Sequence, residues 1–163
     1  MPVLADSTIQ ALVEDEMLGI DPFDPENLTP NGYDLSVAEV LLPDREPDTL
    51  REEGLARIPP RERFVVSTAE TVTLGSSLCA QLWLRTTFAR RGVMAAFGKV
   101  EAGFSGTLTI SCFNAAREAV EIPIGERFCQ IAFEALTGDA EALYEERSGN
   151  YQDQQGVTLA NDG

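Results

Sequence analysis

Short apolar runs alternate with polar and turn-forming residues along most of the chain after residue 30. Residues 33–42 follow an Asn31-Gly32 turn signal and are apolar and β-branched, which predicts a strand. Other short apolar segments, punctuated by Gly and Pro, are also expected to be strands: 64–67, 71–74, 78–84, 93–97, 107–114, 119–122 and 128–136. Many short strands at this spacing favour an all-β fold, a barrel or sandwich of the jelly-roll type.

Near the beginning of the chain, apolar residues recur with a different period. Apolar residues recur there at helical spacing: Ile9, Leu12, Val13 and Met17. Residues 7–18 are therefore expected to form an amphipathic helix that packs against the sheet. Residues 21–30 contain three prolines, which forbid a regular helix and favour an extended, turning connection.

Two further segments have the composition of surface structure. Residues 43–63 are rich in proline and charge, and we expect a surface excursion with at most a brief helix over residues 49–56. Residues 143–163 are polar and contain glycine, which is consistent with a frayed tail and also with a lid that covers a ligand. The length suits one domain over residues 1–163, in which residues 1–30 supply the helix and the connection.

Composition narrows the classes of function. The net charge is -15 and Lys99 is the only lysine, so the chain would repel a nucleic-acid backbone. Hydrophobic residues make up 44% and charged residues 24%, as in soluble globular proteins. The chain has no apolar run long enough to span a bilayer and no signal peptide at its start, so we expect a cytoplasmic protein without a membrane partner.

The absence of histidine excludes several kinds of catalytic site. Ser-His-Asp and Cys-His nucleophiles both need histidine, and the usual zinc sites need a histidine or a Cys-x-x-Cys pair that this chain lacks. Cys79, Cys112 and Cys129 lie far apart within apolar runs and are expected to be buried free thiols. The chemistry must therefore use carboxylates, hydroxyls and water, with or without a hard cation such as Mg²⁺.

Residues 85–106 concentrate polar groups between the apolar segments. They contain three arginines, two adjacent hydroxyls, Lys99 and Glu101. Arginine and small hydroxyls together bind phosphate oxygens, which favours a polyanionic ligand. A carboxylate beside phosphates indicates metal binding or proton transfer from water. A solvated hairpin is equally consistent with the composition of this stretch.

Five motifs occur in the order found in the dCTP deaminase and trimeric dUTPase superfamily, and the chain resembles that superfamily over most of its length. They are Pro-Asn-Gly-Tyr-Asp-Leu-Ser-Val at 30–37, Leu-Arg-Thr-Thr-Phe-Ala-Arg-Arg-Gly at 84–92, Val-Glu-Ala-Gly-Phe-Ser-Gly at 100–106, Gly-Glu-Arg-Phe-Cys-Gln-Ile at 125–131 and Tyr-Gln-Asp-Gln-Gln-Gly at 151–156. The opening helix and residues 19–27 resemble the amino terminus of dCTP deaminases. The Asn-Gly form of the first motif is most similar to the archaeal dUTPase-like branch.

The resemblance implies a distorted β jelly roll that forms a homotrimer, with sites between subunits that bind a deoxynucleoside triphosphate, usually with Mg²⁺. The residues that it implies for phosphate binding are Arg85, Thr86, Thr87, Arg90 and Gln130. Those that it implies for closing over the nucleotide are Tyr144, Tyr151 and Gln154. Asp34 would support the phosphate and metal region, although a solvated aspartate at a strand end is the alternative interpretation.

The resemblance also bears on the reaction. In deaminases of this superfamily a glutamate on the strand after the third motif shuttles protons, and the matching position here is Ser111. In dUTP diphosphatases an aspartate of the third motif receives a proton from water, and it is matched by Glu101, which is one methylene longer. The sequence therefore favours hydrolysis of dUTP to dUMP and diphosphate. The alternatives are dCTP deamination to dUTP and ammonia, both activities together, or a catalytically degenerate nucleotide-binding trimer.

Overall fold

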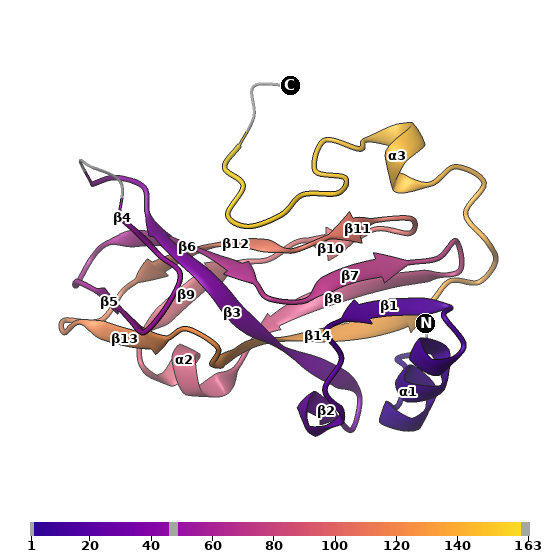
Figure 1. Ribbon diagram of the computed structural model, residues 1–163, viewed down its shortest axis with the longest axis horizontal. Helices are drawn as coiled ribbons and strands as arrows, with labels where there is room; N and C mark the ends of the chain where they lie inside the picture. The colour runs from indigo at the N-terminus through magenta and orange to yellow at the C-terminus, as the bar shows by residue number, and fades with distance from the viewer. Residues whose placement is uncertain (1, 46–48, 161–163) are drawn as a thin grey trace.

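The computed structural model describes residues 2–45 and 49–160 and consists mainly of antiparallel strands (Figure 1). In spatial order the main sheet contains β10 (Lys99–Val100), β8 (Leu78–Leu84), β14 (Arg127–Ala135), β3 (Gly32–Leu42), β6 (Arg63–Thr68), β12 (Thr109–Asn114) and β9 (Val93–Ala96). β2 (Leu28–Thr29) and β4 (Thr49–Arg51) also pair with β3. Neighbours in this sheet are mostly distant in sequence, as in a jelly roll.

Two smaller sheets complete the β structure. One contains β1 (Leu18–Asp21), β7 (Thr71–Leu74) and β11 (Ser105–Gly106), and the other pairs β13 (Val120–Pro123) with β5 (Leu55–Ile58). Helix α1 (Asp6–Glu14) lies at one end of the molecule beside β1 and β14, and α2 (Thr86–Arg90) connects β8 to β9 (Figure 1). A 3-10 turn (Pro25–Asn27) precedes β2, and α3 (Tyr144–Arg147) begins the C-terminal part. No helix in the described segments is long and apolar enough to cross a membrane.

The core lies between the curled main sheet and the smaller sheets. Its largest fully buried side chains include Tyr33, Phe64, Phe88, Phe128 and Phe133. The three cysteines are buried free thiols, as expected. The apolar residues of β3 face this core, but the alternation of inward and outward side chains shifts by one residue within the strand.

A β-bulge in β3 changes which residues face the core. Leu35 and Val37 face inward before it, and Val40 and Leu42 face inward after it. The register with β6 shifts between Val37 and Glu39. Since side chains alternate along a regular strand, Glu39 would otherwise point into the core with Val37. The bulge instead places the partly exposed Glu39 on the outer face.

Two expectations from the sequence were wrong in detail. The helix expected over residues 49–56 is absent there, and β4 and β5 occupy this region of the surface excursion. In β5 exposed and buried residues alternate with the period of a strand, which favours pairing with β13. The first helix ends at Glu14, because Glu16 adopts a φ of 58° and turns the chain toward β1. Met17 is consequently 58% exposed and does not pack with Ile9 in the core.

Candidate active site

Five of the residues predicted for the site line one cavity of about 500 Å³. They are Glu101, Ser111, Tyr144, Tyr151 and Gln154. Glu101 follows β10, Ser111 lies on β12, and the other three belong to the C-terminal part of the chain. The cavity therefore lies between the outer face of the sheet and the C-terminal segment that runs above β12 and β10 (Figure 1).

Glu101 is the one carboxylate among the described residues that line this cavity. It is exposed, and the Ser148 hydroxyl donates a hydrogen bond of 3.3 Å to its Oε2. Arg63 and Lys99 contribute positive charge to the same lining. Ser111 points outward from β12 into the cavity, and not into the core, because Ile110 and Cys112 take the inward positions. The cavity thus offers a carboxylate, several hydroxyls and the Lys99 ammonium to a ligand, while the Arg63 guanidinium is paired with Asp44.

The two tyrosines are connected to each other. The Tyr151 backbone N–H donates to the Tyr144 hydroxyl oxygen at 3.2 Å. The Tyr144 ring packs edge-on against Phe104, with ring centroids 5.5 Å apart. Aromatic rings fixed in this way provide an apolar wall for a planar ligand.

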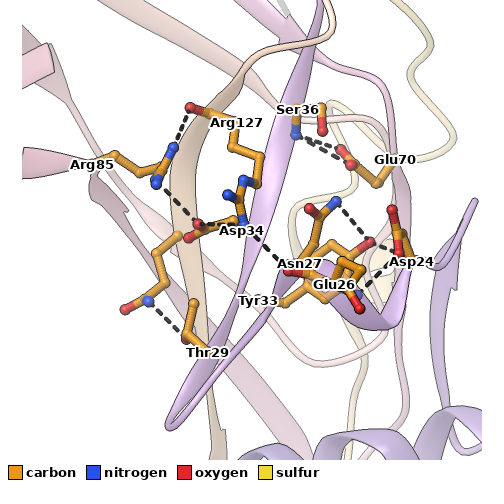
Figure 2. Close-up of polar contacts among 11 residues, drawn as sticks. Asp24, Glu26, Asn27, Thr29, Tyr33, Asp34, Ser36, Glu70, Arg85 and Arg127 are labelled. Atoms are coloured by element: carbon orange, nitrogen blue, oxygen red, sulfur yellow. Dashed lines mark hydrogen bonds and ion pairs between the residues drawn. The ribbon is translucent and has the colours of Figure 1, made fainter. Parts of the chain in front are cut away.

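A second cluster of predicted residues surrounds Asp34 on β3 (Figure 2). Asp34 is 4% exposed, which excludes the interpretation as a solvated strand-end residue. Its Oδ2 lies 3.1 Å from Nε of Arg85 and 3.9 Å from Nη1 of Arg127. Burial raises the pKa of the Asp34 carboxyl, and the positive charges of the two arginines oppose that increase. The side chain of Arg85 also donates to the Arg127 carbonyl oxygen at 3.1 Å, so its guanidinium is fixed at two atoms.

Gln130 and the residues of α2 lie around this cluster. Gln130 is paired in register with Asp34 on one side and with Trp83 on the other, so the three side chains share one face of the sheet. Its amide nitrogen donates to the Thr29 hydroxyl at 2.8 Å. Phe88 anchors α2 by packing on Phe128, with ring centroids 4.8 Å apart. The remaining predicted phosphate-binding residues, Thr86, Thr87 and Arg90, are exposed on α2.

The two groups of predicted residues do not come together within one chain. The lining of the cavity contains none of the predicted phosphate-binding residues of the described segments. The C-terminal segment lies above β12 in Figure 1, whereas α2 lies on the opposite side of the sheet. One chain therefore separates the predicted residues into two groups, which we call half-sites: one with Glu101 and the tyrosines and the other with Asp34 and Arg85.

Two charged residues that shape this region are not predicted from the sequence. Arg127 lies within the fourth motif, three residues before Gln130, and its Nη1 donates to the Glu26 carbonyl oxygen at 3.2 Å. Glu70 is 3% exposed, and its carboxylate accepts the Ser36 backbone N–H at 2.9 and 3.2 Å. Burial raises the pKa of Glu70. Position within a motif could have indicated Arg127, but no local pattern indicated Glu70.

The residues present do not fit a resident magnesium ion. No group of three or more His, Cys, Asp or Glu side chains among residues 2–45 and 49–160 is placed to bind a metal ion. Asp34, the predicted support of the metal region, is paired with two guanidinium groups. Mg²⁺ is commonly held by one or two carboxylates together with substrate phosphates, so an ion carried by a triphosphate needs no such cluster.

Comparison with known proteins supports the arrangement of motifs. A family model described as dCTP deaminase-like matches residues 3–136. The chain belongs to this dCTP deaminase-like family. The dCTP deaminase of Pyrococcus furiosus is 40% identical over 133 residues, which cover 82% of this chain and 83% of that protein. A probable deoxyuridine 5'-triphosphate nucleotidohydrolase of Sulfolobus islandicus rod-shaped virus 1 is 32% identical over 158 residues, covering 97% and 98%.

Solved structures confirm the expected fold of this dCTP deaminase-like chain. The dCTP deaminase of Agrobacterium tumefaciens matches with a TM-score of 0.71 at 18% identity, over 82% of this chain. The chain spans about half of that protein, since the match covers 48% of it. The native EIAV dUTPase matches with a TM-score of 0.54 at 15% identity, covering 81% of this chain and 99% of that one. The distorted jelly roll predicted from the motifs is therefore confirmed.

Proposed function

We propose that the protein is an enzyme that binds a pyrimidine deoxynucleoside triphosphate and deaminates dCTP to dUTP and ammonia. The observation that carries the enzymatic part of this proposal is the position of Glu101 in a cavity beside two tyrosines, which suits either reaction of the superfamily. The Pyrococcus furiosus relative, named dCTP deaminase, supports deamination over the dUTP hydrolysis that the sequence favoured. Deamination therefore takes first place, and hydrolysis becomes the second candidate.

Deamination needs one group that moves protons beside the base. Water adds to C4 of cytosine, and Glu101 accepts the proton that the water loses. Glu101 then returns a proton to the amine, the C4–N bond breaks and ammonia leaves. Ser111 lines the same cavity, but a hydroxyl does not accept a proton at neutral pH without a neighbouring base. Glu101 is therefore the proton-transferring group in this proposal, and Ser111 is left to donate or accept a hydrogen bond.

Hydrolysis of dUTP is favoured by one specific observation. Ser111 stands where the superfamily pattern places the deaminating glutamate, and its side chain is exposed in the cavity. In hydrolysis, water attacks the α-phosphorus, Glu101 accepts its proton and diphosphate leaves. The viral relative with the deoxyuridine triphosphate nucleotidohydrolase name, which matches along almost all of both chains, is consistent with this reaction.

We further propose that the complete site forms between neighbouring subunits of a homotrimer. The two half-sites lie on different sides of one chain, so a neighbouring copy can bring Arg85, Thr86, Thr87, Arg90 and Gln130 to the cavity of the next. Mixing Arg85→Ala chains with Glu101→Gln chains tests this arrangement. If sites form between subunits, reassembled mixtures recover activity that neither variant has alone. If each chain forms its own site, mixing restores nothing.

The experiment that tests the reaction is identification of products from dCTP and from dUTP, each supplied with Mg²⁺. Formation of dUTP and ammonia from dCTP supports deamination. Release of dUMP and diphosphate from dUTP, with dCTP unchanged, replaces deamination with hydrolysis. Formation of dUMP from dCTP indicates both activities. Binding of either triphosphate without any product identifies the catalytically degenerate nucleotide-binding trimer.

A further inference from the structure

The segment that closes the cavity is bound along the edge of the sheet by its own backbone. We call residues 151–158 the C-terminal strap. Gln154 forms a parallel bridge with Gly106, and its carbonyl oxygen accepts the Thr107 N–H at 3.0 Å. The Gln154 side chain donates back to the Thr107 carbonyl oxygen at 2.7 Å. These bonds fix the first half of the strap, which carries Tyr151 and Gln154 into the lining of the cavity.

The second half of the strap is held by a carboxylate from a distant strand. The Val157 backbone N–H donates to Oε2 of Glu39 at 2.6 Å. The neighbouring Thr109 hydroxyl donates to the Gly156 carbonyl oxygen at 3.3 Å and accepts the Thr158 N–H at 3.1 Å. A hydrogen bond to a charged acceptor is stronger than one between neutral groups, so Glu39 makes the strongest of these contacts.

The backbone favours this contact on both of its sides, in the strap at Gly156 and in β3 before Glu39. Gly156 has a φ of +67°, and a Cβ there would lie 2.7 Å from Oε2 of Glu39, so a side chain would displace the carboxylate or the strap. On the other side, the bulge between Val37 and Glu39 turns the glutamate out of the core. A strand without the bulge would not present Glu39 to the strap.

We propose that Glu39 is a positioning residue that anchors the C-terminal strap over the cavity containing Glu101. It lies outside the lining of the cavity and acts through Val157, so it contributes to nucleotide binding without contacting the nucleotide. The anchoring follows from the contacts above, whereas its effect on turnover rests on the proposed function. β3 then carries both supports of the site, Asp34 for the arginines and Glu39 for the strap.

Three variants of the full chain and a control separate anchoring from general damage. Glu39→Ala removes the acceptor, Glu39→Gln keeps an acceptor oxygen without the charge, and Gly156→Ala forces a Cβ against Glu39. Glu121→Ala is the matched control, because Glu121 is an exposed strand glutamate paired with Arg57 far from the strap. Amide exchange is measured residue by residue, and KM and kcat are measured for the triphosphate that the protein turns over.

In Glu39→Ala and Gly156→Ala we expect exchange at Asp153, Gln154 and Val157 to accelerate together by roughly tenfold or more. Glu39→Gln should lie between Glu39→Ala and the native chain. KM should rise about tenfold in Glu39→Ala, with kcat changed less. Faster exchange at Val157 alone, or exchange equal to that of Glu121→Ala, would overturn the anchoring role. Exchange needs no substrate, so this result stands whether or not the proposed reaction is correct.

Discussion

Oδ2 of the buried Asp34 lies 3.1 Å from Nε of the partly exposed Arg85, and this ion pair fixes the first arginine of the second motif. The second contact of Arg85, to the Arg127 carbonyl oxygen, holds its guanidinium at a second nitrogen. A guanidinium that is fixed before the ligand arrives loses little conformational entropy on binding. In the proposed site, Asp34 would act on phosphate through the orientation of Arg85.

Substitution of Arg85 should weaken binding of the triphosphate in either proposed reaction. Arg85→Lys keeps the charge but loses the planar fork that reaches both Asp34 and the carbonyl oxygen, so we expect affinity to fall about tenfold or more. Isothermal titration calorimetry with dCTP and dUTP measures the change. Arg57→Lys is the control, because Arg57 forms an exposed pair with Glu121. Equal affinities of the native chain and Arg85→Lys would mean that the phosphate site lies elsewhere.

The sequence predicted most strands because their apolar runs are bounded by glycine and proline. Residues 71–74 and 78–84 were expected to be strands, and these are the bounds of β7 and β8. β5 was missed because its alternation is in burial and not in residue type: the exposed Leu55 and the buried Ala56 are both apolar. Motifs also group the predicted site residues by their order along the chain, and this order does not show which of them are neighbours in space.

Long-range pairing explains what the sequence could not predict. The separation of the cavity from the Asp34 cluster depends on strand order, which places β14 and β3 side by side although about ninety residues separate them. Glu39 is one of many glutamates in an acidic chain, and only the bulge in β3 distinguishes it. Glu70 lies in the turn between β6 and β7, and its carboxylate accepts a hydrogen bond from the Ser36 N–H of β3, which is distant in sequence. This long-range contact accompanies its burial.

Glu70 should make stability depend on pH. Burial raises its pKa above the ordinary value of 4.5, so the folded state binds a proton that the unfolded state has already released. Stability should therefore fall as pH rises from about 4.5 through the raised pKa. We expect Glu70→Gln to lose this contribution to the slope of the unfolding free energy against pH. The stability of Glu70→Gln minus that of the native chain should therefore be larger at neutral pH than at acidic pH.

Urea unfolding from pH 4 to 8 tests this prediction for the native chain and for Glu70→Gln. Glu121→Gln serves as the control for loss of one negative charge, since its side chain is 52% exposed. Parallel curves for the native chain and Glu70→Gln would show that Glu70 ionises as an exposed glutamate does.

Trp83 should report nucleotide binding directly. It is the only tryptophan in the sequence and is 58% exposed. It lies opposite Gln130 in the register of β8 and β14, on the face that also carries Asp34. A triphosphate held by Arg85 and Gln130 should change its fluorescence, with saturation at the affinity measured by calorimetry. Unchanged emission at saturating nucleotide would remove Gln130 and its neighbours from the binding surface.

The most direct test of the account is the activity of Glu101→Gln with dCTP and with dUTP, measured as products alongside triphosphate affinity. The variant keeps the size and hydrogen-bonding capacity of the side chain but cannot accept a proton at neutral pH. We predict that turnover falls at least about a thousandfold while affinity changes by less than about threefold. Turnover close to that of the native chain, for whichever substrate it uses, would contradict the assignment of proton transfer to Glu101.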